Sequence, residues 1–185
     1  RIVEALAPDV ELAPALSLLA SDVRRDLTRL TNEQTRVLSA ARLNPRLIIT
    51  GRAGTGKTML ALHEVQSLAE EHSSTLLVCP NLTLATLSRE ALGDTEGVTV
   101  ATAGEAVRTR SGSDFEAVVI DEAQDFMSSL PRIVETRARG GISGGSWRVF
   151  FDPAQALIAG NEQLPAPEIN RAAASLRLTL NCRNT

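Results

Sequence analysis

Hydrophobic positions along the chain follow two alternating patterns. Short apolar runs, such as LLVCP (76–80) and AVVID (117–121), alternate with longer stretches in which apolar residues recur at helical spacing, as in residues 57–71. Continuous apolar runs are typical of strands that are buried on both faces, and helices between such strands are typical of a parallel sheet. The pattern therefore predicts an α/β domain with helices on both faces of a parallel sheet.

The expected elements follow from these runs. Strands are predicted at residues 46–50, 76–79, 98–101, 117–121, 148–151 and 176–180, and helices at 31–43 and 57–71. Thr31 is a suitable cap for the first of these helices, with Gln34 at the capping-box position. The segment GGISGG (140–145) has too many glycines for regular structure, which predicts a mobile loop.

Length and composition favour one globular domain. A chain of 185 residues that is 43% hydrophobic can bury one sizeable core. Residues 1–30 contain Pro8, Pro14 and a helix-like stretch, and we interpret them as a helical arm or linker from an upstream domain, with the main domain at 31–185. Membrane-spanning and signal-peptide patterns are missing from the sequence, which predicts a soluble cytoplasmic protein.

The charge balance changes what the domain is expected to bind. The net charge of −3 does not indicate a nucleic-acid-binding protein with a basic face, although a local groove is compatible with it. Of the 19 basic residues, only Lys57 is a lysine, and it falls inside a glycine-rich stretch. The two cysteines, Cys79 and Cys182, give little support for a disulfide or a zinc site.

The glycine-rich stretch fits the pattern G-x-x-x-x-G-K-[ST] between a strand and a helix. It consists of Gly51, Arg52, Ala53, Gly54, Thr55, Gly56, Lys57 and Thr58. Such a turn points backbone N–H groups inward, and the following helix adds a partial positive charge, so a triphosphate fits it. We expect Lys57 to reach the phosphates of ATP and Thr58 to bind Mg²⁺.

A pair of carboxylates after a hydrophobic strand would complete such a site. Asp121 and Glu122 end the run that begins at Ala117, and acids there are costly to bury unless they face a cation or water. We expect Asp121 to hold Mg²⁺ and Glu122 to position or deprotonate the attacking water. A second carboxylate beside the metal ligand favours hydrolysis.

At this point the sequence resembles a known family. Four stretches occur in the order and approximate spacing of motifs I to IV of superfamily 1 DNA helicases of the UvrD/Rep type: GRAGTGKT (51–58), DEAQD (121–125), FDPAQAL (151–157) and LTLNCRNT (178–185). TNEQ (31–34) resembles the Q motif of that family, and LLVCPNLTLA (76–85) resembles motif Ia. The resemblance implies a RecA-like P-loop NTPase fold over residues 31–185. The subgroup fused to a nuclease-related domain is the most similar.

The resemblance implies further roles for three residues. Gln34 would read the adenine edge, Gln155 would contact the γ phosphate and couple it to the DNA side, and Arg183 would reach the γ phosphate. From the residues alone, Gln34 is equally a helix-capping side chain, and Gln155 and Arg183 could be loop or surface residues.

Several features depart from the family pattern. The stretch between Val100 and Phe115 is shorter than the insertion found in the family, and aromatic residues that could stack on single strands are scarce. DNA-contact candidates are Thr83, Thr102 and two groups of arginines (Arg25, Arg29 and Arg36; Arg132, Arg137 and Arg139), although ordinary helix-end hydroxyls and solvated arginines look the same in a sequence.

The chain stops at Thr185, directly after the fourth motif, whereas this family also has a second RecA-like domain. We therefore expect a fragment of a larger protein, weakly active or inactive alone, whose parent hydrolyses ATP while moving on single-stranded DNA. The alternative is an ATPase that works as a regulatory or assembly switch without DNA unwinding. A non-enzymatic binding module is disfavoured, because it leaves Lys57, Thr58, Asp121 and Glu122 unexplained.

Overall fold

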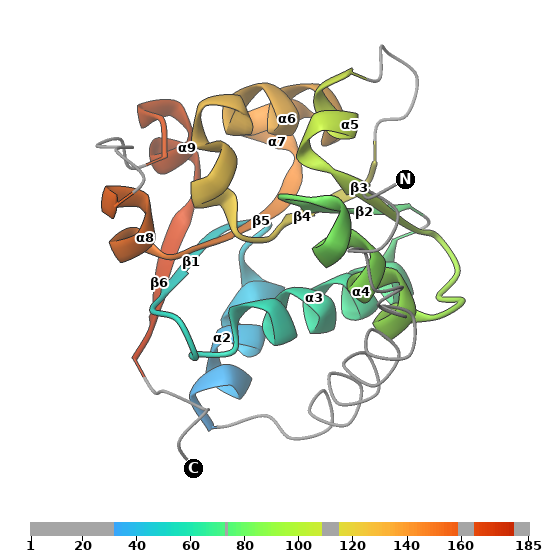
Figure 1. The fold of residues 1–185 in the computed structure, drawn as a ribbon, viewed down its shortest axis with the longest axis horizontal. Coiled ribbons are helices and arrows are strands. Elements are labelled where there is room, and N and C mark those ends of the chain that lie inside the picture. Colours follow the sequence, from blue (N-terminus) through green and yellow to red (C-terminus); the bar gives the residue numbers. More distant parts are fainter. Residues whose placement is uncertain (1–31, 73, 109–114, 159–164, 180–185) are drawn as a thin grey trace, which may run out of the picture.

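A six-stranded parallel sheet forms the centre of the molecule (Figure 1). The computed structural model describes residues 32–72, 74–108, 115–158 and 165–179; the predicted arm at 1–30, Thr31 and Arg183 lie outside these ranges. The strands are β1 (Arg46–Gly51), β2 (Thr75–Cys79), β3 (Val98–Thr102), β4 (Ala117–Ile120), β5 (Ser146–Phe151) and β6 (Ala174–Leu178). Their order is β3-β2-β4-β5-β1-β6, and every pairing is parallel.

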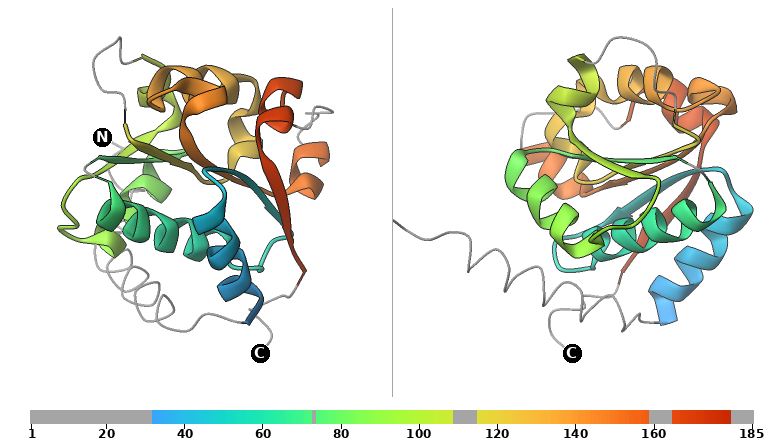
Figure 2. Two further views of the ribbon diagram at one scale, coloured as in Figure 1. Left: turned by 180° about the vertical axis from the view of Figure 1, so that it is seen from behind. Right: turned by 90° about the vertical axis from the view of Figure 1, so that its right-hand side faces the viewer.

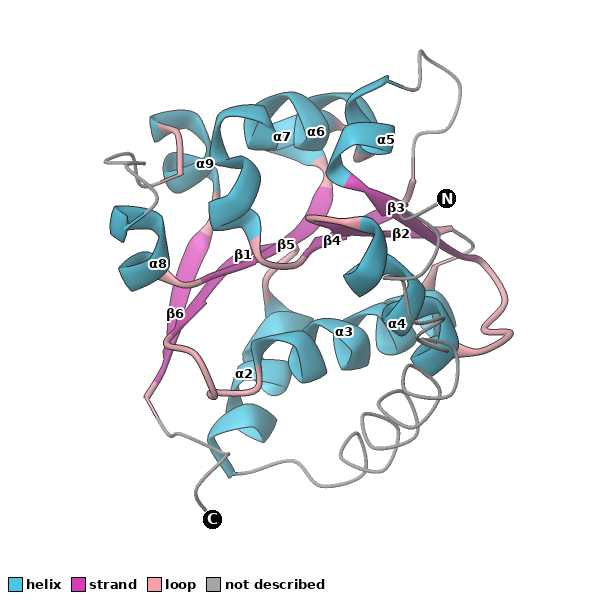
Figure 3. Cartoon of the chain, in the orientation of Figure 1, coloured by secondary structure: helices cyan, strands magenta, loops and turns pink. Residues whose placement is uncertain are grey.

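Helices cover both faces of the sheet and alternate with the strands along the chain (Figures 2 and 3). The layer below the sheet in Figure 1 contains α2 (Asn32–Leu43), α3 (Lys57–Glu71) and α4 (Leu82–Leu92). The layer above it contains α5 (Ala103–Arg108), the 3₁₀ segment η1 (Ala123–Ser129), α6 (Leu130–Arg137), α7 (Gly141–Gly144) and α9 (Pro167–Ala172). A further short helix, α8 (Pro153–Ile158), follows β5 and packs beside η1. The predicted fold class is therefore confirmed.

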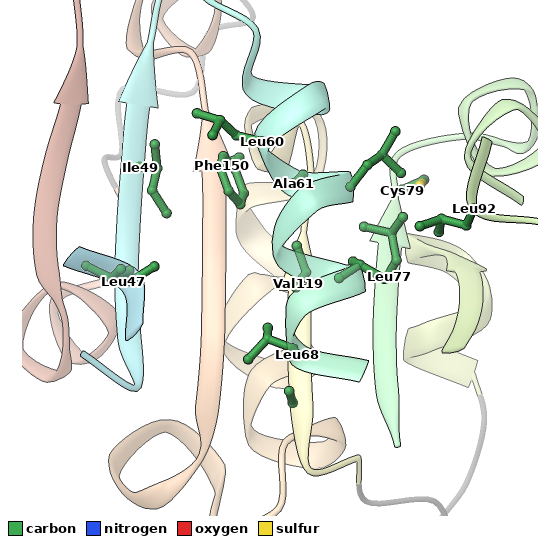
Figure 4. Packing of buried hydrophobic residues seen from close by; sticks show 14 of the residues in the cluster. Leu47, Ile49, Leu60, Ala61, Leu68, Leu77, Cys79, Leu92, Val119 and Phe150 are labelled. Carbon is green, nitrogen blue, oxygen red and sulfur yellow. The ribbon is translucent and has the colours of Figure 1, made fainter. Parts of the chain in front are cut away.

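Two hydrophobic clusters hold the layers together. In the lower cluster, Leu60 and Leu68 of α3 pack against a row of strand residues that includes Ile49, Phe150 and Val119 (Figure 4). The upper cluster joins the other face of the same strands to η1, α5, α6 and α9. Strands β2 and β4 are buried along their whole length, which explains their continuous apolar runs. Full burial of one such side chain contributes about 1.5 to 3 kcal/mol relative to leaving it exposed.

The predicted boundaries were least accurate where burial is incomplete. Edge strand β6 runs from Ala174 to Leu178, two residues earlier than predicted, because Ala174 and Ser175 are exposed and interrupt the apolar pattern. Strand β5 likewise begins at Ser146, before its apolar run.

The prediction of a mobile loop at 140–145 was wrong, because the glycines form the short helix α7. Its first turn is held by Glu135, whose carboxylate accepts a hydrogen bond from the N–H of Ile142 at 2.9 Å. A Cβ atom on Gly141 would lie 2.6 Å from that carboxylate, and Gly141 has a φ of +61°. The glycines there permit close packing.

The parallel sheet places the candidate site. All strands end at one edge, so the segments after β1, β4 and β5 emerge there together, although they are far apart in the sequence.

Candidate nucleotide-binding site

The glycine loop follows β1 directly and leads into α3. Gly54 and Gly56 have φ angles of +84° and +79°, in the left-handed region that favours glycine. Thr55 closes the turn, because its N–H and its hydroxyl both donate to the carbonyl of Arg52, at 3.2 and 2.8 Å. The local sequence therefore folds as a tight turn with the N-terminus of α3 directly behind it.

Lys57 is the first residue of α3 and is only 5% exposed. Its Nζ atom donates to the carbonyl oxygens of Gly51 at 3.0 Å and Arg52 at 3.4 Å. A buried ammonium group needs such acceptors, because burial without them is costly. The side chain thus folds back across the loop that it terminates, within reach of any anion that the loop holds.

Asp121 lies immediately after β4 and is 1% exposed. It forms a hydrogen bond with the hydroxyl of Thr58, and its Oδ1 atom accepts from the N–H of Glu122 at 3.0 Å. Within the described residues it makes no ion pair. The pKa of Asp121 is raised to about 7, chiefly by burial and also by the negative charge of Glu122, while the two hydrogen bonds and the positive charge of Lys57 oppose the shift.

Thr58 and Asp121 provide a hydroxyl and a carboxylate at one point. The described residues contain no group of three or more His, Cys, Asp or Glu side chains that could hold a metal unaided. Mg²⁺ does not need such a group, since it keeps several waters and is commonly bound by one or two carboxylates together with phosphates of a substrate. The donor set therefore fits Mg²⁺ bound with a nucleotide.

Glu122 adopts a left-handed backbone conformation, with φ 49° and ψ 46°. This conformation costs a non-glycine residue about 1 to 3 kcal/mol. The carboxylate is held by Gln124, whose Nε2 atom donates to its Oε2 atom at 2.5 Å. The strained backbone and the hydrogen bond together fix the direction of the acid at the carboxyl edge of the sheet.

Gln124 also connects this acid to the segment after β5. It is 2% exposed, its Nε2 atom donates to Oε1 of Gln155 at 3.2 Å, and its Oε1 atom accepts from the N–H of Asp152 at 3.0 Å. Glu122 and Gln155 thereby share Gln124 as a hydrogen-bond partner. Gln124 was not among the predicted site residues, although its place within DEAQD is a sequence signal for it.

Gln34 lies against the glycine loop from the side of α2. It is 5% exposed, and its Nε2 atom donates to the carbonyl of Thr55 at 3.4 Å. A Cβ atom on Gly56 would lie 2.4 Å from the same nitrogen, so any other residue at this positive φ would be strained and would also displace the Gln34 amide. Of the predicted site residues within the described ranges, Gln34, Lys57, Thr58 and Asp121 therefore lie together at the loop and the start of α3, and Glu122 and Gln155 are joined to each other through Gln124.

A second buried charged group lies below the sheet, away from the loop. Glu64 of α3 and Arg148 of β5 form an ion pair at 3.1 Å, and Arg148 also donates to the carbonyls of Ala41 and Pro45 at 2.8 and 2.6 Å. Burial raises the pKa of Glu64, and the positive charge of Arg148 opposes that shift. The sequence analysis did not predict this pair, because a charged residue in a strand and one in a helix carry no pairing signal.

Several residues considered for DNA contact have partners within the protein. Arg137 is buried and donates to the carbonyl of Ala106 at 2.8 Å, and Arg139 pairs with Glu116 at 2.9 Å. The hydroxyl of Thr102 hydrogen-bonds the Glu105 carboxylate at 2.8 Å in a capping arrangement at the start of α5. Hydrogen bonds from Thr102 also lower the pKa of Glu105. Among the helices that the structure describes, none is long and apolar enough to cross a membrane.

The parallel sheet, the glycine loop after β1 and the acids after β4 define a RecA-like α/β domain. The family model described as "Schlafen group 3, DNA/RNA helicase domain" matches residues 45–180, and the chain belongs to this family. No curated protein matches the chain.

Solved structures of Pif1 helicases have a similar fold. A Bacteroides Pif1 bound to ssDNA is 16% identical with a TM-score of 0.52, over 85% of this chain and 43% of that one. The Pif1 helicase from Candida albicans is 18% identical with a TM-score of 0.53, over 81% and 40% of the two chains. At these identities the likeness shows the fold. The chain spans less than half the length of either structure.

Proposed function

We propose that this chain is the Mg-ATP-binding and hydrolysing motor domain of a superfamily 1 helicase or translocase that acts on single-stranded DNA. The observation that carries the proposal is the meeting of Thr58 and a buried Asp121 beside Lys57, which the parallel sheet brings together from two distant segments. Membership of a DNA/RNA helicase family supports it, since helicases use ATP.

The loop and its lysine would bind the phosphates of ATP. Backbone N–H groups of residues 51–57 and the N-terminus of α3 supply positive potential, and Lys57 exchanges the carbonyls of Gly51 and Arg52 for phosphate oxygens. Thr58 and Asp121 would hold Mg²⁺. Bound ATP supplies the phosphoanhydride bond whose hydrolysis releases energy.

The remaining site residues act on the two ends of the nucleotide. Glu122 accepts a proton from the attacking water, with its carboxylate directed by Gln124. Gln155 contacts the γ phosphate and couples it to the DNA side, and Arg183 reaches the same phosphate. Gln34 reads the adenine edge from its position beside Thr55.

The partners follow from the helicase assignment. We propose that the complete protein moves along single-stranded DNA, because a Pif1 structure of this fold class is described as bound to ssDNA. We also propose a second RecA-like domain in the same protein, because that Pif1 chain is more than twice as long as its matched part. We also retain the UvrD/Rep-type branch, a nuclease-related neighbouring domain and an N-terminal arm at residues 1–30 as parts of this proposal.

The test is ATP turnover by the complete protein with and without a single-stranded oligonucleotide, using DNA and RNA of the same sequence. A Glu122→Gln variant serves as the blank, because an amide cannot accept the proton. Turnover that rises with DNA, and less with RNA, supports a motor on DNA. Turnover that ignores both would contradict the motor assignment.

A nucleotide-dependent switch is the second candidate. The acidic balance of the chain and the internal engagement of Arg137 and Arg139 favour it, because they leave less basic surface for DNA. Binding to a protein partner that depends on nucleotide, combined with turnover indifferent to DNA, would support the switch in place of the motor.

A further inference from the structure

The first turn of α2 reaches two different parts of the carboxyl edge. Gln34 donates to the carbonyl of Thr55 in the glycine loop. Its neighbour Glu33 accepts hydrogen bonds from Thr179, at the end of β6. Two adjacent residues of one helical turn therefore contact the loop and the edge strand, and Figure 2 shows the start of α2 beside the end of β6.

The contact with Thr179 replaces a missing strand pairing. The ladder between β1 and β6 ends at Gly51 and Leu178, because the chain after Gly51 turns into the glycine loop. The N–H of Thr179 donates instead to both carboxylate oxygens of Glu33, at 3.0 and 3.1 Å, and the Thr179 hydroxyl donates at 2.6 Å. Hydrogen bonds to a carboxylate are stronger than those between neutral groups.

Strand β6 depends on such contacts more than the central strands do. In the described part of the sheet it is an edge strand that pairs with β1 alone, and Leu178 is its only buried residue. The ends of β1 and β6 also pack tightly, since a Cβ atom on Gly51 would lie 3.1 Å from Cβ of Leu178 and 2.5 Å from Oγ1 of Thr55. The loop, the first turn of α2 and the end of β6 thus form one continuous set of contacts.

We propose that Glu33 is a positioning residue that couples occupancy of the glycine loop to the end of β6. The coupling rests on the proposed nucleotide binding. A phosphate in the loop draws the backbone around Thr55 and Lys57 toward itself, Gln34 follows the Thr55 carbonyl, and Glu33 moves with Gln34 because both belong to one hydrogen-bonded turn. Thr179 and the end of β6 then become more ordered when the loop holds a nucleotide than when it is empty.

The experiment is amide hydrogen exchange on the 185-residue chain with and without ADP and Mg²⁺, read at the segment containing Leu178 and Thr179. In the unsubstituted chain, nucleotide is expected to slow exchange there on the order of fivefold, the lower end of common coupling factors. In Glu33→Ala, affinity for ADP stays within about twofold, but exchange at this segment no longer responds to nucleotide. Glu70→Ala, which removes an exposed glutamate near the end of α3, is the matched control and keeps the response.

A second variant separates coupling from loss of folding. Thr179→Val removes the hydroxyl contact and keeps the main-chain one, so it should retain the fold and show a reduced response. The inference is overturned if Glu33→Ala responds to nucleotide as the unsubstituted chain does, or if nucleotide binds the unsubstituted chain without any change at β6. A chain that does not bind ADP at all would instead overturn the proposed function, and the coupling with it.

Discussion

Two buried carboxylates, Glu64 and Asp121, have contrasting surroundings. Glu64 is 5% exposed and faces Arg148, which also binds backbone carbonyls, so the charges there are compensated within the protein. Asp121 is 1% exposed and has a hydroxyl, an N–H group and a second acid, Glu122, as its neighbours. The first carboxylate is paired without a ligand, whereas Asp121 makes no ion pair within the described residues and its charge is only partly offset by Lys57.

The position of each carboxylate in the fold explains the difference. Arg148 lies in β5 opposite Leu47 and Val119, on the face that packs against α3, so its pair with Glu64 joins the sheet to the helical layer. Asp121 lies past the end of β4, at the edge where ligands of parallel α/β proteins bind. The charge of Glu64 is therefore compensated within the fold, whereas that of Asp121 carries an electrostatic cost that a bound cation would relieve.

The largest expected effect is on the free energy of unfolding when the ion pair between Glu64 and Arg148 is broken. Arg148→Met leaves the Glu64 carboxylate buried and unpaired, which should lower the free energy of unfolding by about 3 to 5 kcal/mol. Urea denaturation measures the change. The double variant Glu64→Leu with Arg148→Met removes both charges and should recover most of the loss; equal instability of the single and double variants would show that packing, not charge, is responsible.

The next effect concerns the loop. Lys57→Ala should lower ATP turnover by the complete protein by about 100- to 1000-fold, as expected when a positioned charge that stabilises phosphate is removed. Its free energy of unfolding should change less than that of Arg148→Met, because the described hydrogen bonds of Lys57 go to loop carbonyls and the substitution leaves no carboxylate that had been ion-paired. ATP turnover that is unchanged in Lys57→Ala would show that the nucleotide-binding site is not at the glycine loop.

The pH dependence of the free energy of unfolding should reveal the buried carboxyl group of Asp121. Because the pKa of Asp121 is raised to about 7, the folded chain retains a proton that the unfolded chain releases near pH 4. The stability that this proton contributes is present below pH 4 and is lost as the pH rises to about 7. Unfolding measured in metal-free buffer should therefore show the unsubstituted chain losing about 2 to 4 kcal/mol relative to Asp121→Asn over this range. Parallel pH profiles for the two proteins would contradict this.

The smallest effect tests the link between the acids and the segment after β5. Gln124→Ala removes the hydrogen bond to Glu122, and the loss of about 1.5 kcal/mol for a bond to a charged group corresponds to roughly tenfold slower turnover. Gln66→Ala, on the partly exposed side of α3, is a matched control that should leave turnover unchanged. A Gln124 variant with unaltered turnover would reduce this residue to a packing role.

The fold was predictable because its central strands are buried on both faces. Burial is visible in the sequence as continuous apolar runs around Leu77 and Val119, and the glycine loop has a fixed local pattern. The start of β6 and the helix at Gly141–Gly144 were missed, since exposed strand residues and tightly packed glycines give no periodic signal.

The candidate site was predictable only as a set of separate motifs. Lys57, Thr58 and Asp121 follow from local patterns with a known spatial consequence in parallel sheets. The hydrogen bonds of Gln124 and the contact between Glu33 and Thr179 join residues that are distant in the sequence, and such pairings depend on the tertiary fold.

The most direct test of whether Thr58 and Asp121 hold Mg²⁺ with a nucleotide is a titration of the chain with ADP, with and without Mg²⁺, by calorimetry. Mg²⁺ should strengthen ADP binding by about tenfold or more, and Asp121→Asn should lose this dependence while binding ADP without Mg²⁺ at least as well as before. The second part follows because the substitution removes a negative charge near the phosphates. If Mg²⁺ strengthens ADP binding equally in both proteins, Asp121 does not hold the metal, and the proposed Mg-nucleotide site is wrong.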